Sequence, residues 1–203
     1  DRQAVIAAAA DGLGVPIGSY YASGMPGYTD TTGVIGFDIE KSKALLQEAG
    51  VSNLQLTITL PPPPYARQGG EVIAAELAKV GITARLENVE WAQWLSKVYG
   101  QADYDMTIIS HVEAYDLGNL VKPKYYWNYQ SADVQGLYNR MLQAGDADER
   151  KALIAQIQKK VAEDCPSAYL YQPQWITVAN ANLQGVWKDI PIFVNDLANL
   201  RWA

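Results

Sequence analysis

Between residues 38 and 109 the sequence alternates between helical and strand-like hydrophobic periods, and this alternation restricts the fold more than any other feature. In chain order, the periods predict a helix at 38–49, a strand at 54–60, a helix at 67–80, a strand at 82–86, a short helix at 91–98 and a strand at 106–109. Strands joined by helical crossovers pair in parallel, with right-handed connections. We therefore expect an α/β fold with a mainly parallel sheet that carries helices on both faces.

Capping residues indicate where several helices begin and end. Asp38 is expected to cap the helix that follows it, and Gly50 stands where that helix stops. Further along, apolar residues at helical spacing predict a helix at 134–142 and another at 153–161. Asp146 would cap the second of these, so the two helices form an antiparallel pair.

The two ends of the chain carry weaker patterns. Residues 1–10 have a helical pattern without a start signal, which we interpret as a truncation point or a processed start. Residues 12–36 are rich in Gly, Pro, Ser and Tyr and are expected to run over the surface as a loop. Late strands are predicted at 169–171 and 176–178. The predicted units are a lead-in helix and surface loop at 1–36, an α/β ligand-binding lobe at 37–175 and a C-terminal tail at 176–203.

Composition and charge exclude several classes of partner. The 203 residues are 49% hydrophobic, which is enough for a buried core. A net charge of -6 with scattered Lys and Arg argues against nucleic acid, because phosphate binding needs a clustered basic face. No run approaches the roughly 18 apolar residues of a membrane helix. The single cysteine, Cys165, can form neither an internal disulfide nor a metal cluster.

The binding site is expected where loops follow the first and third strands. If the strands lie in the order 2-1-3, with helices on opposite faces, these loops diverge at the carboxyl edge of the sheet and open a crevice. The loops are 61–67 and 110–119, and an aromatic run at 125–129 comes shortly after. Aromatic faces beside carboxylates suit a small polar organic solute that carries an ammonium group. The expected ligand-binding residues are His111, Glu113, Tyr115, Asp116, Asn119, Tyr125, Tyr126, Trp127, Pro63 and Tyr65.

Three segments in this order carry a resemblance to a known family. Residues 37–50, FDIEKSKALLQEAG, are similar to a recurrent helix, YDPEKAKALLAEAG. Residues 72–95 resemble the stretch LAKIGIKVELRPVEWATWL, and residues 104–109 resemble a strand that enters a pocket. These patterns are typical of family 5 solute-binding proteins, the peptide, opine and nickel class. The resemblance implies the carboxy-terminal lobe of a periplasmic-binding-protein-like fold, which closes on an N-terminal lobe that this chain lacks.

The resemblance also implies a function. Such a protein captures a solute for an ABC importer and delivers it to membrane permease subunits, in the periplasm or as an extracellular lipoprotein of a Gram-positive cell. Peptide-binding members commonly carry Trp-x-x-Asp after the third strand, and counting puts His111 at the tryptophan and Ala114 at the aspartate. The usual peptide clamp is therefore absent, and the stretch looks more like the opine-type branch, which points to an amino-acid-derived or sugar-derived solute. The solute expected is a small peptide, an opine-like compound or a related polar organic molecule. Glu113 or Asp116 would replace the lost carboxylate.

Other interpretations remain open. Nickel, another metal chelate or an oligosaccharide are alternative solutes of the same fold. His111 is the only histidine and no Gly-x-Ser-x-Gly motif is present, so we expect no enzyme, no cofactor and no metal site. The aromatic run can instead pack against a neighbouring lobe, with the carboxylates as caps or turn formers. A non-ligand interaction module would use the tail residues Trp187, Pro191, Phe193 and Trp202.

Overall fold

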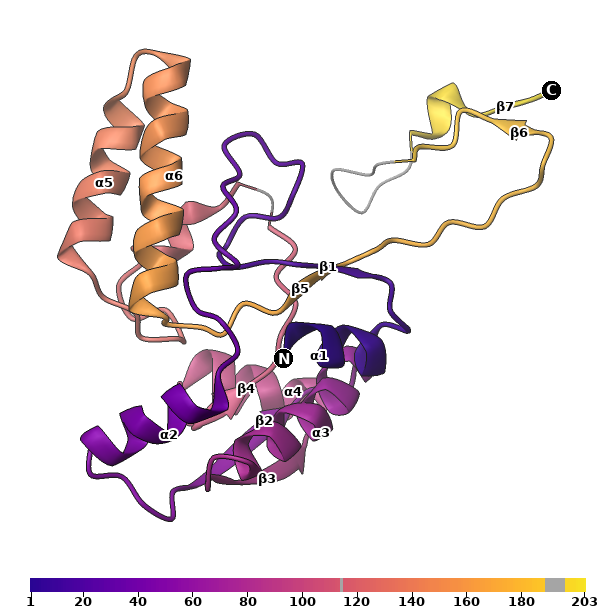
Figure 1. Cartoon of the computed structure of the whole chain (residues 1–203). Helices are drawn as coiled ribbons and strands as arrows, with labels where there is room; N and C mark the ends of the chain where they lie inside the picture. Colours follow the sequence, from indigo (N-terminus) through magenta and orange to yellow (C-terminus); the bar gives the residue numbers. More distant parts are fainter. Residues whose placement is uncertain (114, 189–195) are drawn as a thin grey trace.

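The computed structural model describes residues 1–113, 115–188 and 196–203. Its helices are α1 (Arg2–Ala9), α2 (Ile39–Glu48), α3 (Pro64–Ala78), α4 (Trp91–Trp94), α5 (Ala132–Gln143) and α6 (Ala147–Asp164), and its shorter helical turns are η1 (Leu95–Gly100), η2 (Leu117–Leu120) and η3 (Leu197–Asn199). Its strands are β1 (Gly14–Pro16), β2 (Gln55–Leu60), β3 (Thr83–Asn88), β4 (Met106–Thr107), β5 (Tyr171–Pro173), β6 (Leu183–Gln184) and β7 (Arg201–Trp202). The hairpin of α5 and α6 stands apart from the sheet, and the tail runs away on the other side (Figure 1).

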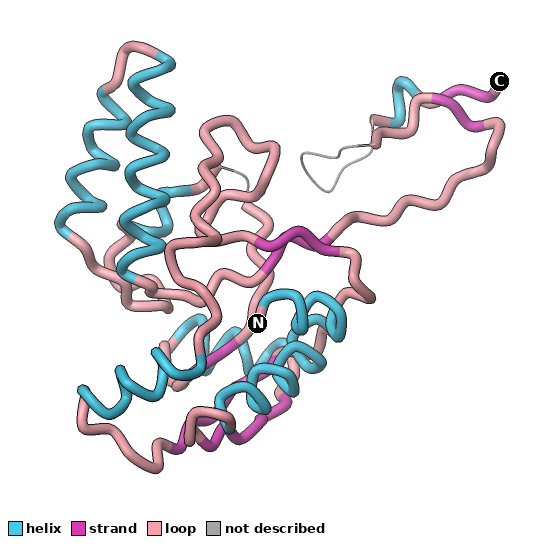
Figure 2. Tube along the Cα trace, viewed as in Figure 1, coloured by secondary structure: helices cyan, strands magenta, loops and turns pink. Residues whose placement is uncertain are grey.

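The central sheet has the predicted order. Its three strands lie as β3-β2-β4, which is the order 2-1-3, and both neighbours of β2 are parallel to it. Ile58 in the middle strand is opposite Leu86 on one side and Met106 on the other. Two smaller antiparallel pairs, β1 with β5 and β6 with β7, lie outside this sheet (Figure 2). The prediction of a mainly parallel sheet is confirmed.

One face of the sheet is apolar and packs on α3. Ile58 and Leu60 are fully buried there with Ala66, and Gly70 lets α3 approach so closely that a Cβ at that position would lie 2.6 Å from Leu60. α1 packs on the outer side of α3 through Val5, which lies 3.6 Å from the Cβ position of Gly69. Alternation along β2 and β3 therefore turns their apolar side chains toward a two-layer stack of helices.

The opposite face of the sheet is polar and is covered by α4 and η1. The Trp94 indole N–H donates to the Thr107 hydroxyl at 2.9 Å, and Lys97 pairs with Glu87 at 3.2 Å. η1 is a single stretch of π-helix that continues α4. Helices thus lie on both faces, as predicted, but the second layer is held through polar contacts rather than through a second apolar face.

The helix at the start of the chain has a cap, so the interpretation that it lacks a start signal was wrong. The Asp1 carboxylate accepts hydrogen bonds from the backbone N–H groups of Gln3 at 2.9 Å and Ala4 at 3.2 Å. This is the geometry of an N-cap. The predicted caps Asp38 and Asp146 are confirmed, because each accepts backbone N–H groups from the first turn of its helix.

The segment after β1 does not simply run over the surface. Gln158, buried on α6, fixes it through both ends of its side-chain amide. The amide oxygen accepts from the Ser19 hydroxyl and the Thr29 N–H, both at 3.2 Å, and the amide nitrogen donates to the Gly27 carbonyl at 2.6 Å. A sequence rich in turn formers gave no sign of this partner, which lies 139 residues from Ser19. The segment therefore packs against the α5–α6 hairpin, where Tyr21 is buried with Val134 and Ile157.

The late part of the chain differs from its prediction. β5 begins at Tyr171 and pairs with β1, whereas Ile176 and Val178 form no strand and are 67% and 92% exposed. The second late strand was therefore wrong, because apolar character alone does not supply a pairing partner. Pro191 and Phe193 lie outside the described residues. The division of the chain at residues 36 and 176 stays a prediction.

Candidate functional site

The two loops expected to face the site meet at one edge of the sheet. β2 and β4 are adjacent and parallel, so the turns that follow them leave from the same end. The Tyr65 hydroxyl accepts a hydrogen bond from the Ser110 N–H at 3.1 Å and joins the turns directly. Pro63 is the N-cap of α3, which begins at Pro64 instead of residue 67 because proline at the first helical position gives up no hydrogen bond. Pro63 and Tyr65 therefore border residues 110–119.

His111 lies at the centre of this edge. Its Nε2 shares a 2.8 Å hydrogen bond with the Tyr126 hydroxyl, and its Nδ1 lies 3.2 Å from a carboxylate oxygen of Glu113. The imidazole is 23% exposed and Glu113 is 49% exposed. The histidine is held between a buried hydroxyl and a carboxylate that remains in contact with water.

An aromatic cluster packs around the imidazole. Tyr125 and Tyr126 are buried, at 7% and 5% exposure, and pack on Val89, Trp94 and Val98, so they form the floor of the cluster. Trp127 lies 4.5 Å from Tyr125 and 5.2 Å from His111, measured between ring centroids. Trp127 is only partly buried. The rings predicted to contact a ligand are brought together, but two of them lie below the surface.

The remaining predicted residues occupy the turn around η2. Tyr115 is 54% exposed with a positive φ of 63°, and its ring lies 6.3 Å from that of Tyr21. Asp116 is the residue before η2 and is half-buried. Asn119 is 8% exposed, and its amide donates to the Tyr20 hydroxyl at 3.5 Å. Ala114, expected at the position of the family's aspartate, lies outside the described residues.

The charged side chains at this edge include two carboxylates, Glu113 and Asp116. Partial burial alone would raise the pKa of Glu113, but its own N–H, the His111 imidazole and the Val112 N–H together lower that pKa below the ordinary value. Burial raises the pKa of Tyr125 and Tyr126, so both hydroxyls stay protonated at neutral pH. Within the ranges that the structure describes, no lysine or arginine forms an ion pair with Glu113 or Asp116. The Glu113 carboxylate is instead paired with the His111 imidazole.

We expect the Glu113 carboxyl to titrate below 4.5, its ordinary pKa. Because the unfolded chain releases this proton at the ordinary value, the contribution of Glu113 to stability is fully present above that value and is lost as the pH falls through the lower folded pKa. Carbon-13 NMR of the side-chain carboxyl during an acid titration measures the shift. A Glu113 pKa at or above the ordinary value would contradict the described contacts.

Tyr20 is a site residue that sequence reasoning missed. Its ring centroid lies 6.1 Å from those of both His111 and Trp127, and it reaches them from the segment after β1. The adjacent pair Tyr20 and Tyr21, in a segment otherwise rich in small and turn-forming residues, was the available signal.

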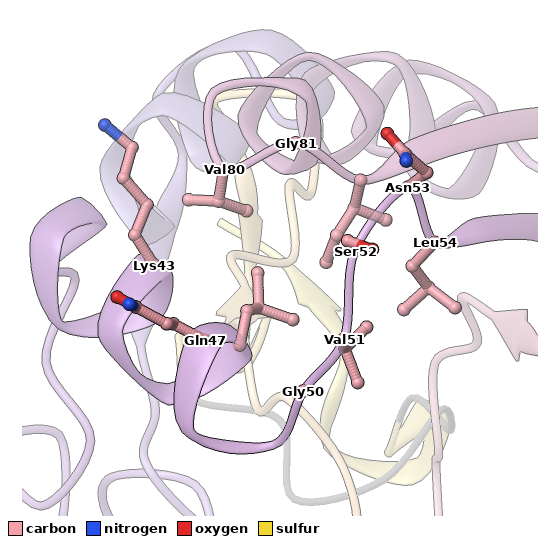
Figure 3. A pocket seen from close by; sticks show the side chains of 11 residues that line it. Lys43, Gln47, Gly50, Val51, Ser52, Asn53, Leu54, Val80 and Gly81 are labelled. Carbon is pink, nitrogen blue, oxygen red and sulfur yellow. The ribbon is translucent and has the colours of Figure 1, made fainter.

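Two hollows lie away from this edge. The larger, about 480 Å³, lies between the end of α2 and the turn before β3 and is lined by Leu46, Val51 and Val80 among others (Figure 3). It is at the amino ends of β2 and β3, opposite the strand-end turns. A polar groove of about 280 Å³ lies over Glu87 and Lys97 on the polar face. Neither hollow is lined by residues of the two strand-end turns.

Comparisons with known proteins decide the family. The profile of the bacterial extracellular solute-binding proteins, family 5 (middle part), matches residues 1–135. The chain belongs to family 5 of the bacterial extracellular solute-binding proteins. It is 24% identical to di/tripeptide-binding protein 4 of Pseudomonas aeruginosa over 95% of this chain and 38% of that protein.

Solved structures of similar proteins share the fold of this family 5 lobe. The binding protein AgaA from A. tumefaciens R10, in complex with agropinic acid, is 28% identical, with a TM-score of 0.73 over 85% of this chain and 38% of that chain. A dipeptide-binding protein from Pseudoalteromonas sp. SM9913, in complex with Met-Leu, is 21% identical, with a TM-score of 0.83 over all of this chain and 43% of that one. The chain spans less than half the length of each relative.

Two further observations concern a possible metal site and a possible membrane-spanning helix in this family 5 member. Among the residues that the structure describes, no three His, Cys, Asp or Glu side chains come together as a metal site, so His111, Glu113 and Asp116 do not form one. In the same residues, no helix has the length and apolar character needed to cross a bilayer.

Proposed function

We propose that this lobe forms one wall of the solute site in the binding component of an ABC importer, and that the site is the edge formed by residues 61–67 and 110–119. The hydrogen bond from Ser110 to Tyr65 carries this proposal, because it brings both strand-end turns to one accessible surface. Crevices at the carboxyl ends of parallel strands are the usual ligand sites of open α/β sheets. In this proposal the edge is half of a cleft, and a second lobe supplies the other wall.

The solute in this proposal is a small peptide, an opine-like compound or a related polar molecule with an ammonium group. Glu113 and Asp116 would hold that group, and aromatic rings would cover its apolar part. Similar proteins are described as di/tripeptide-binding and as bound to agropinic acid, which supports an amino-acid-derived solute. No catalytic role is proposed, since the matched relatives are binding proteins.

The partners in this proposal are a second lobe and the permease subunits of the importer, with the protein located in the periplasm or at the outer face of the cytoplasmic membrane. The described tail residues Ile176, Val178, Leu197 and Trp202 are more than half exposed. Such large exposed side chains suit packing against the second lobe. A docking role without any solute remains the competing proposal.

A solute screen on the protein that carries both lobes tests the proposal. Thermal shift followed by calorimetry would compare glycyl-leucine, octopine, a nickel–histidine chelate and a short oligosaccharide. We expect a peptide or opine to bind most tightly, and Glu113→Gln with Asp116→Asn to weaken it by about tenfold or more, because each removes a charge-assisted contact.

The control variant is Glu48→Gln, an exposed carboxylate at the opposite end of the sheet. It should leave the affinity unchanged. Tightest binding of the nickel chelate or the oligosaccharide would replace the proposed solute, and an absence of binding to all four probes would favour a docking module.

A further inference from the structure

The backbone on both sides of Tyr20 is anchored beside the proposed site. Its neighbours Ser19 and Tyr21 are 0% and 2% exposed, and Ser19 donates to buried Gln158. Gly18 lies so close to Thr31 that a Cβ there would be 2.2 Å from the Thr31 carbonyl carbon. The segment after β1 therefore brings Tyr20 to Asn119 in the second strand-end turn.

The hydrogen bonding of Tyr20 is incomplete within the described chain. The hydroxyl oxygen accepts from the amide of Asn119, a residue that is itself 8% exposed. A phenol also has one proton to donate. None of the residues described here accepts that proton. Burial raises the pKa of Tyr20, so the hydroxyl keeps its proton at neutral pH.

Trp127, whose ring adjoins those of Tyr20 and His111, carries a second unused donor. Its indole nitrogen is buried and has no partner among the described residues. A buried donor left unpaired destabilises the folded state, so such a group is normally given a partner. The Trp127 and Tyr20 rings meet edge to face at 6.1 Å, and both flank His111. Two rings that adjoin the imidazole thus each carry an unused donor, while the imidazole Nδ1 lies 3.2 Å from the Glu113 carboxylate.

We propose that the Tyr20 hydroxyl and the Trp127 indole N–H bind an acceptor oxygen of the solute, a carboxylate. The inference rests on the proposed function and makes it more specific. Glu113 and Asp116 take the ammonium group and the Tyr20–Trp127 pair takes the carboxylate, so the solute is a zwitterion. Tyr20 is then a specificity residue that comes from outside the two strand-end turns. The indole nitrogen is covered in this structure, so the proposal requires side chains around it to rotate on a fixed backbone when the carboxylate binds.

Calorimetry on the two-lobed protein tests this with matched probes. Glycyl-leucine and octopine carry both charged groups, and glycyl-isopentylamide is glycyl-leucine without its carboxylate. Tyr20→Phe should weaken glycyl-leucine or octopine by about tenfold, since hydrogen bonds to charged groups are the stronger class. It should leave the weaker binding of glycyl-isopentylamide unchanged. The indole N–H resonance of Trp127 should shift only with the carboxylate-bearing probes.

Tyr28→Phe is the matched control. Tyr28 lies in the same segment, but it packs against the buried cluster that contains Val134 of α5 and Ile157 of α6 and not against His111. It should bind like the unmodified protein, and equal melting temperatures would show that both variants fold. If glycyl-leucine or octopine binds and Tyr20→Phe binds it equally well, the inference is wrong while the proposed function stands. If neither zwitterion binds the unmodified protein, the proposed solute class fails and the inference fails with it.

Discussion

Replacing Gln158 with alanine is expected to lower the free energy of unfolding by about 3 kcal/mol or more, because it leaves one buried and two partly buried polar groups without this partner. The Ser19 hydroxyl, the Thr29 N–H and the Gly27 carbonyl all bond to this one side chain, which is 1% exposed. Urea unfolding followed by circular dichroism measures the loss. Amide hydrogen exchange should show faster opening of residues 17–34 than of β2.

Gln156→Ala is the control for this variant. Gln156 lies on the same helix, is exposed and is the same residue type, so its removal should change stability by a few tenths of a kcal/mol at most. Equal losses for the two variants would mean that the amide of Gln158 is not the anchor of the segment.

Gly18→Ala is expected to lower the free energy of unfolding by about 2 kcal/mol or more and to weaken solute binding. A Cβ at Gly18 would lie 2.2 Å from the carbonyl carbon and 2.4 Å from the oxygen of Thr31, both of which are backbone atoms. Backbone cannot rotate away as a side chain can, so the segment must shift, and overpacking of this kind typically costs about 1–3 kcal/mol. Thermal unfolding and calorimetry with glycyl-leucine measure the two effects.

Gly33→Ala provides the comparison in the same segment. Nothing lies within 4 Å of its Cβ position, so alanine should be neutral or slightly stabilising through a less flexible unfolded chain. A stable Gly18→Ala variant that binds normally would show that the approach of residues 18 and 31 does not position Tyr20.

The sheet and its helices were predictable because their signals are local. Alternation in β2 and β3 and helical spacing in α2 and α3 repeat within a few residues, and parallel pairing with right-handed crossovers then leaves few possible orders. The caps Asp38 and Asp146 were visible for the same reason, since each bonds within the first turn of its own helix.

The support of the site was not predictable from local patterns. Tyr20 meets Asn119 across 99 residues and Ser19 meets Gln158 across 139, and no short window contains both partners. Burial of Tyr125 and Tyr126 was missed for a related reason. The aromatic run indicated a ligand surface, but the apolar side chains of α4 and η1 cover part of it.

The contact between Tyr20 and Asn119 also affects the order in which parts of the lobe are expected to fold. Closing a chain between residues 20 and 119 costs more entropy than pairing β2 with β3, whose partners are separated by only 28 residues. The parallel sheet and its helices are therefore expected to consolidate first, and the carboxylate-binding pair last. The lobe is therefore expected to pass through a stage with native secondary structure in which the contact between Tyr20 and Asn119 has not yet formed.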